Sequence, residues 1–194
     1  MKQATVLAIF FAFVSFSYAN PISNNIPSRV KNSGDTSLMK VSDIREMLQE
    51  IIDLTGLQTD IELREADVLN IEASISHRKR YISYNPSYIT SLNKITKNKW
   101  AVMALLAHEV GHHLNGHTIR KGGSTPELEL EADEFAGFIL YRLGATLQQS
   151  QNVMYYIAKV KESKTHPSKN SRLLAIEKGW NRASGLQDIT TAKR

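Results

Sequence analysis

The stretch LLAHEVGHHLNGHT, residues 105–118, limits the possible structures of this chain more than any other part of it. It contains four of the six histidines of the protein, within a segment whose apolar spacing predicts a helix that is apolar on most sides of its first half. His108, Glu109 and His112 form the pattern H-E-x-x-H. On a helix, residues four apart lie on one face, so both imidazoles can bind one zinc ion while Glu109 reaches a water on that ion. Burying two histidines and a glutamate in an apolar helix is unfavourable unless a metal binds them. We therefore expect a Zn²⁺ site on a central, buried helix.

A catalytic zinc ion needs a third protein ligand and one open position. The chain contains no cysteine, so this ligand must be His, Asp or Glu. In one known arrangement it is a histidine six residues after the second one, but that position is Thr118, and His117 comes one residue too early. In another it is a glutamate from a following helix, and ELELEADEFAG supplies several acidic residues. Glu129 and Asp133 are four apart and share a face, so we expect Glu129 to bind zinc and Asp133 to accept a hydrogen bond from a ligand histidine.

The other histidines and acidic residues nearby are not expected to bind metal. Glu131 lies about 160° around its helix from the metal-binding face, and we expect it to face solvent. His113 projects about 100° away from His112 and is also predicted to lie at the surface. His117, near the end of the helix, and His77, in a turn, have no predicted role.

The rest of the chain predicts an α+β domain that is mainly helical. Residues 41–56 have helical apolar spacing, with Gly56 as the stop. Residues 59–84 alternate apolar and polar positions, which indicates two or three short antiparallel strands followed by NPS at 85–87. Further helices are predicted from about residue 98 through the H-E-x-x-H pattern, from Thr125 to Gly144, and at about 146–162 and 168–183.

Both ends of the chain are expected to lie outside this domain. Residues 1–19 combine Lys2, an apolar run and small residues at the position that a signal peptidase reads, which is typical of a cleaved secretory signal peptide. The run of about 13 residues is shorter than the roughly 20 that a membrane-spanning helix needs, and an uncleaved anchor is the alternative. Residues 20–40 predict a flexible lead-in, 41–184 the folded domain and 185–194 a flexible tail. We expect an exported, periplasmic or extracellular protein that is soluble after signal cleavage.

The charge of the chain is modest. A formal net charge of +5 does not by itself indicate a nucleic-acid partner, and none is predicted. No segment after the signal is long and apolar enough to span a membrane.

Three motifs together resemble the peptidase family of the membrane CAAX-prenyl endopeptidases and the bacterial heat-shock protease HtpX. The first is H-E-x-x-H followed by E-x-x-A-D within ELEADEFAG. The second is THPSKNSR, residues 165–172, which is similar to the H-P-x-x-x-x-R segment of that family. The third is NIEASIS, residues 70–76, which is similar to the strand that is thought to pair with extended substrate there. The resemblance covers roughly residues 41–180; the chain departs from the family in lacking transmembrane helices and in reading N-I-E-A where N-A-x-A is more common.

The resemblance implies a zincin-type domain of the gluzincin group and roles for four residues. Glu129 would be the third zinc ligand and Asp133 its neighbouring partner. His166 would stabilise an oxyanion or act as a fourth zinc ligand, with a helix cap as the alternative. Arg172 would position substrate or neighbouring carboxylates, with a solvated helix arginine as the alternative.

These observations predict a zinc metalloendopeptidase that hydrolyses peptide bonds of unfolded or misfolded exported proteins, with Glu109 as the general base. An unfolded polypeptide segment would be the partner, added as a strand along residues 71–76. Two alternatives stay open: a zinc-binding chaperone or adaptor that does not cut its clients, and a zinc amidase that acts on cell-wall peptide.

Overall fold

The structure is a computed structural model that describes residues 40–58, 60–120 and 122–185. The expected signal peptide, residues 20–39 of the lead-in, and the tail after Gly185 lie outside the described residues. The described chain forms α helices, three strands and one 3-10 helix in the order α1 (Val41–Thr55), β1 (Ile61–Glu65), β2 (Ile71–Ser76), β3 (Lys79–Tyr84), α2 (Pro86–Thr96), α3 (Lys99–Leu114), η1 (His117–Ile119), α4 (Pro126–Arg142), α5 (Leu147–Ile157) and α6 (Lys169–Ser184). This confirms the predicted α+β class.

The three-stranded sheet is mixed, so the prediction of an antiparallel sheet was wrong for one of its strands. β2 and β3 pair antiparallel, whereas β1 pairs parallel with β3, and the strand order is β1-β3-β2. The turn between β2 and β3 is tight, with His77 and Arg78 both at positive φ (50° and 66°). Alternation along each strand fixes which side chains share a face but not the order of the strands. Here the chain crosses the end of the sheet after β1, and β3 then inserts between β1 and β2.

Helix α2 was not predicted, although its start carries a clear signal. The Asn85 side chain accepts hydrogen bonds from the backbone N–H groups of Ser87 and Tyr88, and Pro86 occupies the first helical position. Asn at an N-cap followed by Pro is a common helix start. The segment NPS therefore ends the sheet and begins a helix at once.

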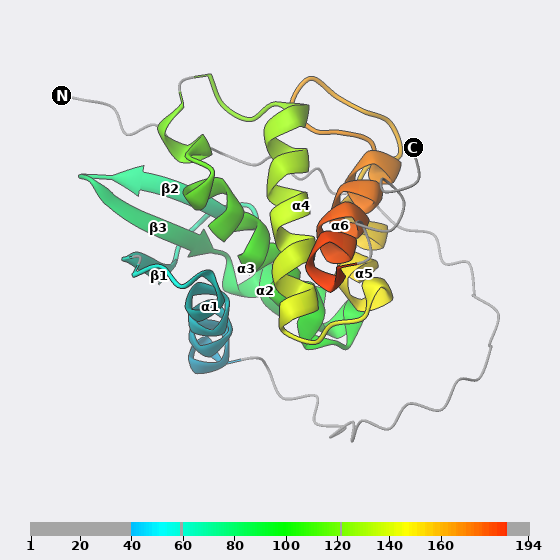
Figure 1. The fold of residues 1–194 in the computed structure, drawn as a ribbon. Coiled ribbons are helices and arrows are strands. Elements are labelled where there is room, and N and C mark those ends of the chain that lie inside the picture. Colours follow the sequence, from blue (N-terminus) through cyan, green and yellow to red (C-terminus); the bar gives the residue numbers. More distant parts are fainter. Residues whose placement is uncertain (1–39, 59, 121, 186–194) are drawn as a thin grey trace.

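Helix α3 packs against several elements and has little contact with solvent. It contacts α1, α2, α4, α5 and strand β2, and its residues from Ala101 to His113 are all buried. Figure 1 shows the sheet and α1 on one side of α3 and α4, α5 and α6 on the other. A side chain on α3 therefore points into the protein interior in almost every direction.

Helices α4 and α6 approach each other closely enough for their backbones to touch. A Cβ atom on Gly137 of α4 would overlap the carbonyl oxygen of Ile176, and one on Gly179 of α6 would overlap that of Glu134. Glycine at both positions is what permits this approach. The contact fixes α6 against the helix that carries the predicted third zinc ligand.

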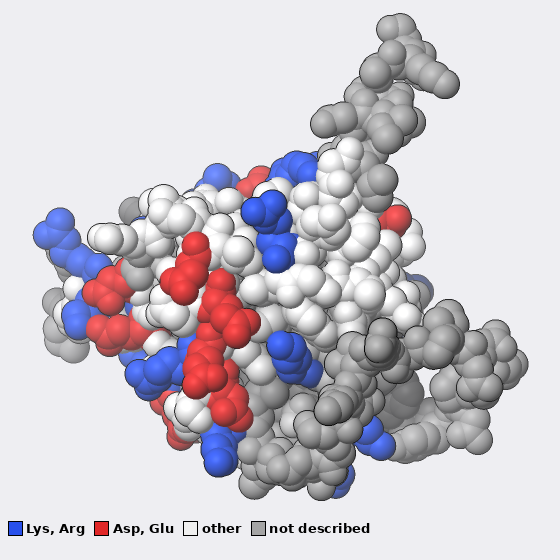
Figure 2. Space-filling model, turned by 60° about the horizontal axis from the view of Figure 1, so that its bottom comes forward, with Lys and Arg blue, Asp and Glu red and all other residues white. Residues whose placement is uncertain are grey.

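The surface in Figure 2, which brings the bottom of the molecule in Figure 1 forward, carries a group of acidic side chains with Lys and Arg scattered around them. Helix α1, which lies at the bottom of Figure 1, carries exposed Glu46, Glu50 and Asp53 at helical spacing. Among the described residues seen in this view, the Lys and Arg side chains form no continuous basic surface. Within the described ranges, every helix falls short of the length and hydrophobicity that crossing a bilayer requires.

Candidate metal centre

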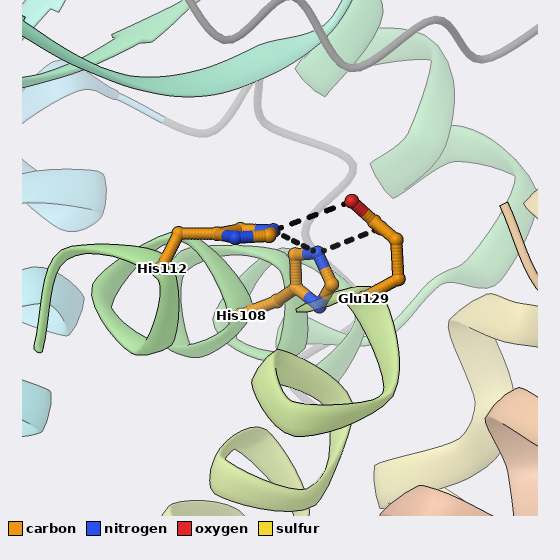
Figure 3. A group of neighbouring side chains, drawn as sticks. All are labelled: His108, His112 and Glu129. Atoms are coloured by element: carbon orange, nitrogen blue, oxygen red, sulfur yellow. Dashed lines mark hydrogen bonds and ion pairs between the residues drawn. The ribbon is translucent and has the colours of Figure 1, made fainter. Parts of the chain in front are cut away.

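Three buried side chains from α3 and α4 converge on one point. His108 and His112 lie one turn apart on α3, and Glu129 lies in the first turn of α4 (Figure 3). The two Nε2 atoms are 3.0 Å apart, and the carboxylate oxygens of Glu129 lie 3.4 Å from Nε2 of His108 and 3.5 Å from Nε2 of His112. Ligand atoms around a tetrahedral zinc ion lie about 3.3 Å apart, so these distances fit a shared metal ion.

His108 is oriented by a buried carboxylate that is itself held by an arginine. Its Nδ1 atom lies 2.9 Å from Oδ1 of Asp133. Nε and Nη2 of Arg172 each donate to the same carboxylate at 2.7 Å. A carboxylate that accepts from Nδ1 directs the lone pair of Nε2 toward the metal position, which is a common arrangement around zinc-bound histidines. Asp133 thus lies where the sequence predicted it.

His112 is oriented by a second imidazole. Its Nδ1 atom lies 2.9 Å from Nδ1 of His117, and Nε2 of His117 lies 2.9 Å from Oε2 of Glu131. The prediction gave His117 and Glu131 no part in the site, but the structure brings both to it. The sequence feature that could have indicated this contact is the spacing of five residues between His112 and His117, with a glycine between them at which the chain can turn.

Glu129 has a third kind of partner. The hydroxyl of Ser124, which is buried, donates a hydrogen bond to Oε1 of Glu129. Oε2 of Glu129 is buried and has no hydrogen-bond partner among the described residues. It faces the imidazole of His108 and lies 3.8 Å from Nη2 of Arg172. One oxygen is therefore fixed by the loop before α4, and the other is directed into the cluster.

The charged groups around the cluster shift the pKa values of its members in opposite directions. Burial lowers the pKa of His108, but the carboxylates of Asp133 and Glu129 outweigh it and raise that pKa to about 10. Burial raises the pKa of Glu129, but His108 and Arg172 hold it well below its usual value. Burial and the charge on His108 lower the pKa of His112 well below its usual value. The buried carboxylates thus favour a positive charge at His108, and a divalent metal ion bound at Nε2 would supply one in place of a proton.

Glu109 lies next to the cluster and contacts the sheet. Its Oε2 atom accepts a hydrogen bond of 2.7 Å from the backbone N–H of Ala73 in β2. Its Oε1 atom is buried and has no hydrogen-bond partner among the described residues. Burial raises the pKa of Glu109 to about 8, partly offset by the charge on His108. The arrangement gives one oxygen that is anchored and one that is able to take up a proton.

Among the described strands, β2 is the last one of the sheet, and β3 pairs with it on one side only. Asn70 and Asn85 are a hydrogen-bonded pair at the end of the ladder, and opposite residues alternate between bonded and non-bonded pairs along antiparallel strands. The backbone groups of Ala73, three residues further, therefore point away from β3 and toward α3. This is the edge on which the sequence predicts strand addition.

The prediction that His113 lies at the surface was wrong. Its side chain is only 2% exposed, and its Nε2 atom donates to the carbonyl oxygen of Tyr81 in β3 at 3.0 Å. Burial lowers the pKa of His113 to about 4, so the ring is neutral. The prediction used the angle of about 100° between His113 and His112 around the helix. Such an angle places a side chain in solvent only if the helix has a solvent-facing side, and α3 has almost none. His77 is exposed in the turn, as predicted.

Arg172 and His166 differ in their contacts. Arg172 is 2% exposed and contacts Asp133, Glu129 and His108 from α6, so it lies against neighbouring carboxylates and is not a solvated arginine. His166 lies in the loop between α5 and α6, with its Nδ1 atom 2.8 Å from the hydroxyl of Thr165. Burial lowers the pKa of His166, while the charge of Glu129 acts in the opposite direction. Its catalytic role stays a prediction.

Comparisons of the chain with protein-family models, curated proteins and solved structures gave no match.

Proposed function

We propose that the protein is a zinc-dependent metalloendopeptidase with a zincin-type centre of the gluzincin group. The observation that carries this proposal is the convergence of His108, His112 and Glu129, with Glu109 buried beside them on the same helix. Two nitrogen ligands and one carboxylate are a donor set that zinc enzymes use for hydrolysis. The motif resemblance to the CAAX-prenyl endopeptidase and HtpX family supports the same activity. Export to the periplasm or the outside of the cell, from the signal-like residues 1–19, is part of this proposal.

Bound zinc would lower the pKa of a coordinated water and polarise the scissile carbonyl group. Glu109 accepts the proton of the attacking water at Oε1 and delivers it to the leaving amine, while Ala73 holds Oε2 in place. Asp133 fixes the ring of His108, and Arg172 holds Asp133. His166 would stabilise the oxyanion from the loop before α6.

The substrate would be an unfolded polypeptide segment. Strand β2 lies at the edge of the sheet and contacts Glu109, so a strand added along it would bring its peptide groups to the metal centre. Main-chain hydrogen bonds to a strand edge require little sequence preference but do require an extended chain. Misfolded exported proteins meet that requirement.

The substitution Glu109→Gln tests the function directly. We expect the variant to bind one zinc ion per chain as the wild type does, and to hydrolyse casein about 10²–10⁴-fold more slowly, because the base is removed while the ligands stay. Zinc content and casein hydrolysis are measured side by side, with exposed Glu127→Gln on α4 as the control. A compactly folded protein is expected to be hydrolysed more slowly than casein.

Retained hydrolysis in Glu109→Gln, or loss of its zinc, would contradict this assignment. A wild-type protein that binds zinc but cuts no peptide would favour a chaperone or adaptor, and release of cell-wall fragments in place of casein peptides would favour an amidase.

A further inference from the structure

The two histidine ligands have different partners, and the partner of His112 is unusual. His117 is 1% exposed and lies in η1, just after α3. Its ring meets that of His112 edge to face, with centroids 5.0 Å apart and an interplanar angle of 70°. The two Nδ1 atoms are 2.9 Å apart, which is hydrogen-bond distance for one donor and one acceptor.

The carboxylate of Glu131 decides which atom donates. A carboxylate only accepts hydrogen bonds, so Nε2 of His117, at 2.9 Å from Oε2 of Glu131, carries a hydrogen. A neutral imidazole has one N–H group, so Nδ1 of His117 accepts. Nδ1 of His112 then donates, and Nε2 of His112 presents its lone pair to the metal position. The chain Glu131–His117–His112 thus selects the tautomer of a metal ligand.

The local backbone places His117 in this position. Gly116 adopts the left-handed conformation (φ 73°) at the end of α3, which residues with a side chain rarely adopt. The chain turns back there, and the His117 ring comes to lie against the ring of His112. Glu131 comes from α4, two residues after Glu129, so one helix supplies a ligand and the end of the chain of hydrogen bonds.

The two tautomer-setting chains also differ in exposure. Asp133 and Arg172 are both buried, at 0% and 2%, whereas the side chain of Glu131 is 55% exposed. One ligand histidine is therefore connected to a closed ion pair, and the other to a carboxylate at the surface.

We propose that His117 and Glu131 form a positioning relay that holds His112 in its metal-binding tautomer and orientation and thereby tightens metal binding. The proposal rests on the metal centre of the proposed function. His117 and Glu131 are positioning residues, because they act through His112 and touch no substrate.

The test is the zinc dissociation constant of the full-length protein, measured by competition with a chromophoric chelator. His117→Leu removes the acceptor for Nδ1 of His112, and we expect zinc binding about 10–100-fold weaker. His117→Asn offers an amide oxygen as acceptor and is expected to recover most of the loss. Glu131→Ala removes the acceptor for Nε2 of His117 and is expected to weaken zinc binding more than Glu127→Ala, the same change on an exposed residue one turn earlier on α4.

A spectroscopic measurement separates positioning from a general structural role. In the ¹H–¹⁵N imidazole spectrum of the zinc-loaded wild type, we expect the hydrogen of His112 on Nδ1 and that of His117 on Nε2. The opposite tautomers would overturn the proposal. So would a His117→Leu protein that binds zinc as tightly as the wild type, or a His117→Asn protein as weak as the Leu variant.

The remaining outcomes are also decisive. If His117→Leu does not fold, as judged by circular dichroism, the comparison of Glu131→Ala with Glu127→Ala decides, and equal zinc affinities overturn the relay. If the wild type binds no zinc, both the relay and the proposed function fail. If the wild type binds zinc tightly but cuts no peptide, only the proposed function fails, and the relay is judged on the affinities.

Discussion

Arg172 is a charged side chain in the protein interior, and its charge is balanced by residues of the metal centre. It donates two hydrogen bonds of 2.7 Å to Asp133, which in turn contacts His108 at 2.9 Å. Removing one partner of such a buried pair leaves the other charge without compensation, which is far more destabilising than the pair itself is stabilising. The same helix carries Arg182, whose ion pair with Glu134 is 51% exposed on the arginine side.

These two arginines of α6 give a matched pair of substitutions. We expect Arg172→Met to lower the free energy of unfolding by about 3–5 kcal/mol, because Asp133 is left buried without its cation. Arg182→Met should lower it by about 1 kcal/mol or less, because its ion pair is exposed to solvent. Urea unfolding measured on both variants checks this. Equal losses would show that Asp133 does not depend on Arg172.

At the scale of elements, the contact between α4 and α6 fixes the positions of residues in the metal centre. α4 carries Glu129 and Asp133, and α6 carries Arg172, so the distance between the two helices sets the geometry of the buried ion pair. Gly137 and Gly179 allow the backbones to meet without side chains between them. Any side chain there would push the helices apart.

Alanine at these glycines tests the contact. Gly137→Ala and Gly179→Ala would each place a methyl group against a backbone carbonyl, and we expect each to lower the free energy of unfolding by about 1–3 kcal/mol or more. Zinc affinity should also fall in both variants. Asn170→Ala on the exposed face of α6 is the control, since alanine is a better helix former than asparagine. Glycine variants as stable as this control would contradict the close approach.

The helices that carry the metal ligands were predictable, because apolar periodicity, the H-E-x-x-H spacing and the Thr125-Pro126 start are local signals. Helix α2 was missed although Asn85 and Pro86 mark it. The parallel pairing of β1 with β3 and the burial of His113 depend on contacts between distant segments, which local patterns do not contain. The contact of His117 and Glu131 with the metal centre depends on how the chain turns at Gly116. It was missed because local patterns do not contain it either.

At the scale of the whole molecule, the metal would be a cross-link in a chain that contains no cysteine. It would join α3 to α4, two helices in contact that also pack against other parts of the fold. An ion that binds only the folded state stabilises it in proportion to the logarithm of its concentration over its dissociation constant.

Removal of zinc with a chelator is therefore expected to lower the melting temperature, and returning zinc should restore it. Zinc at 1,000 times its dissociation constant would contribute about 4 kcal/mol. Thermal unfolding followed by circular dichroism checks this, with His77→Ala as the control, since His77 is exposed and lies outside the cluster. His108→Ala should lose the response to zinc. If the melting temperature of the wild type is the same with and without zinc, the ion makes no contribution to the stability of the fold.

The direct backbone contact at Gly137 and Gly179 also restricts how this sequence can drift over evolutionary time. Rotamer changes cannot relieve a clash between a methyl group and a main-chain carbonyl, so neither position accepts a replacement while the helices stay in place. Homologues that retain this helix pair should keep both glycines even where the histidines and Glu109 have been replaced. An alignment of such homologues would then use the two glycines to trace the scaffold, and the histidines to trace the activity.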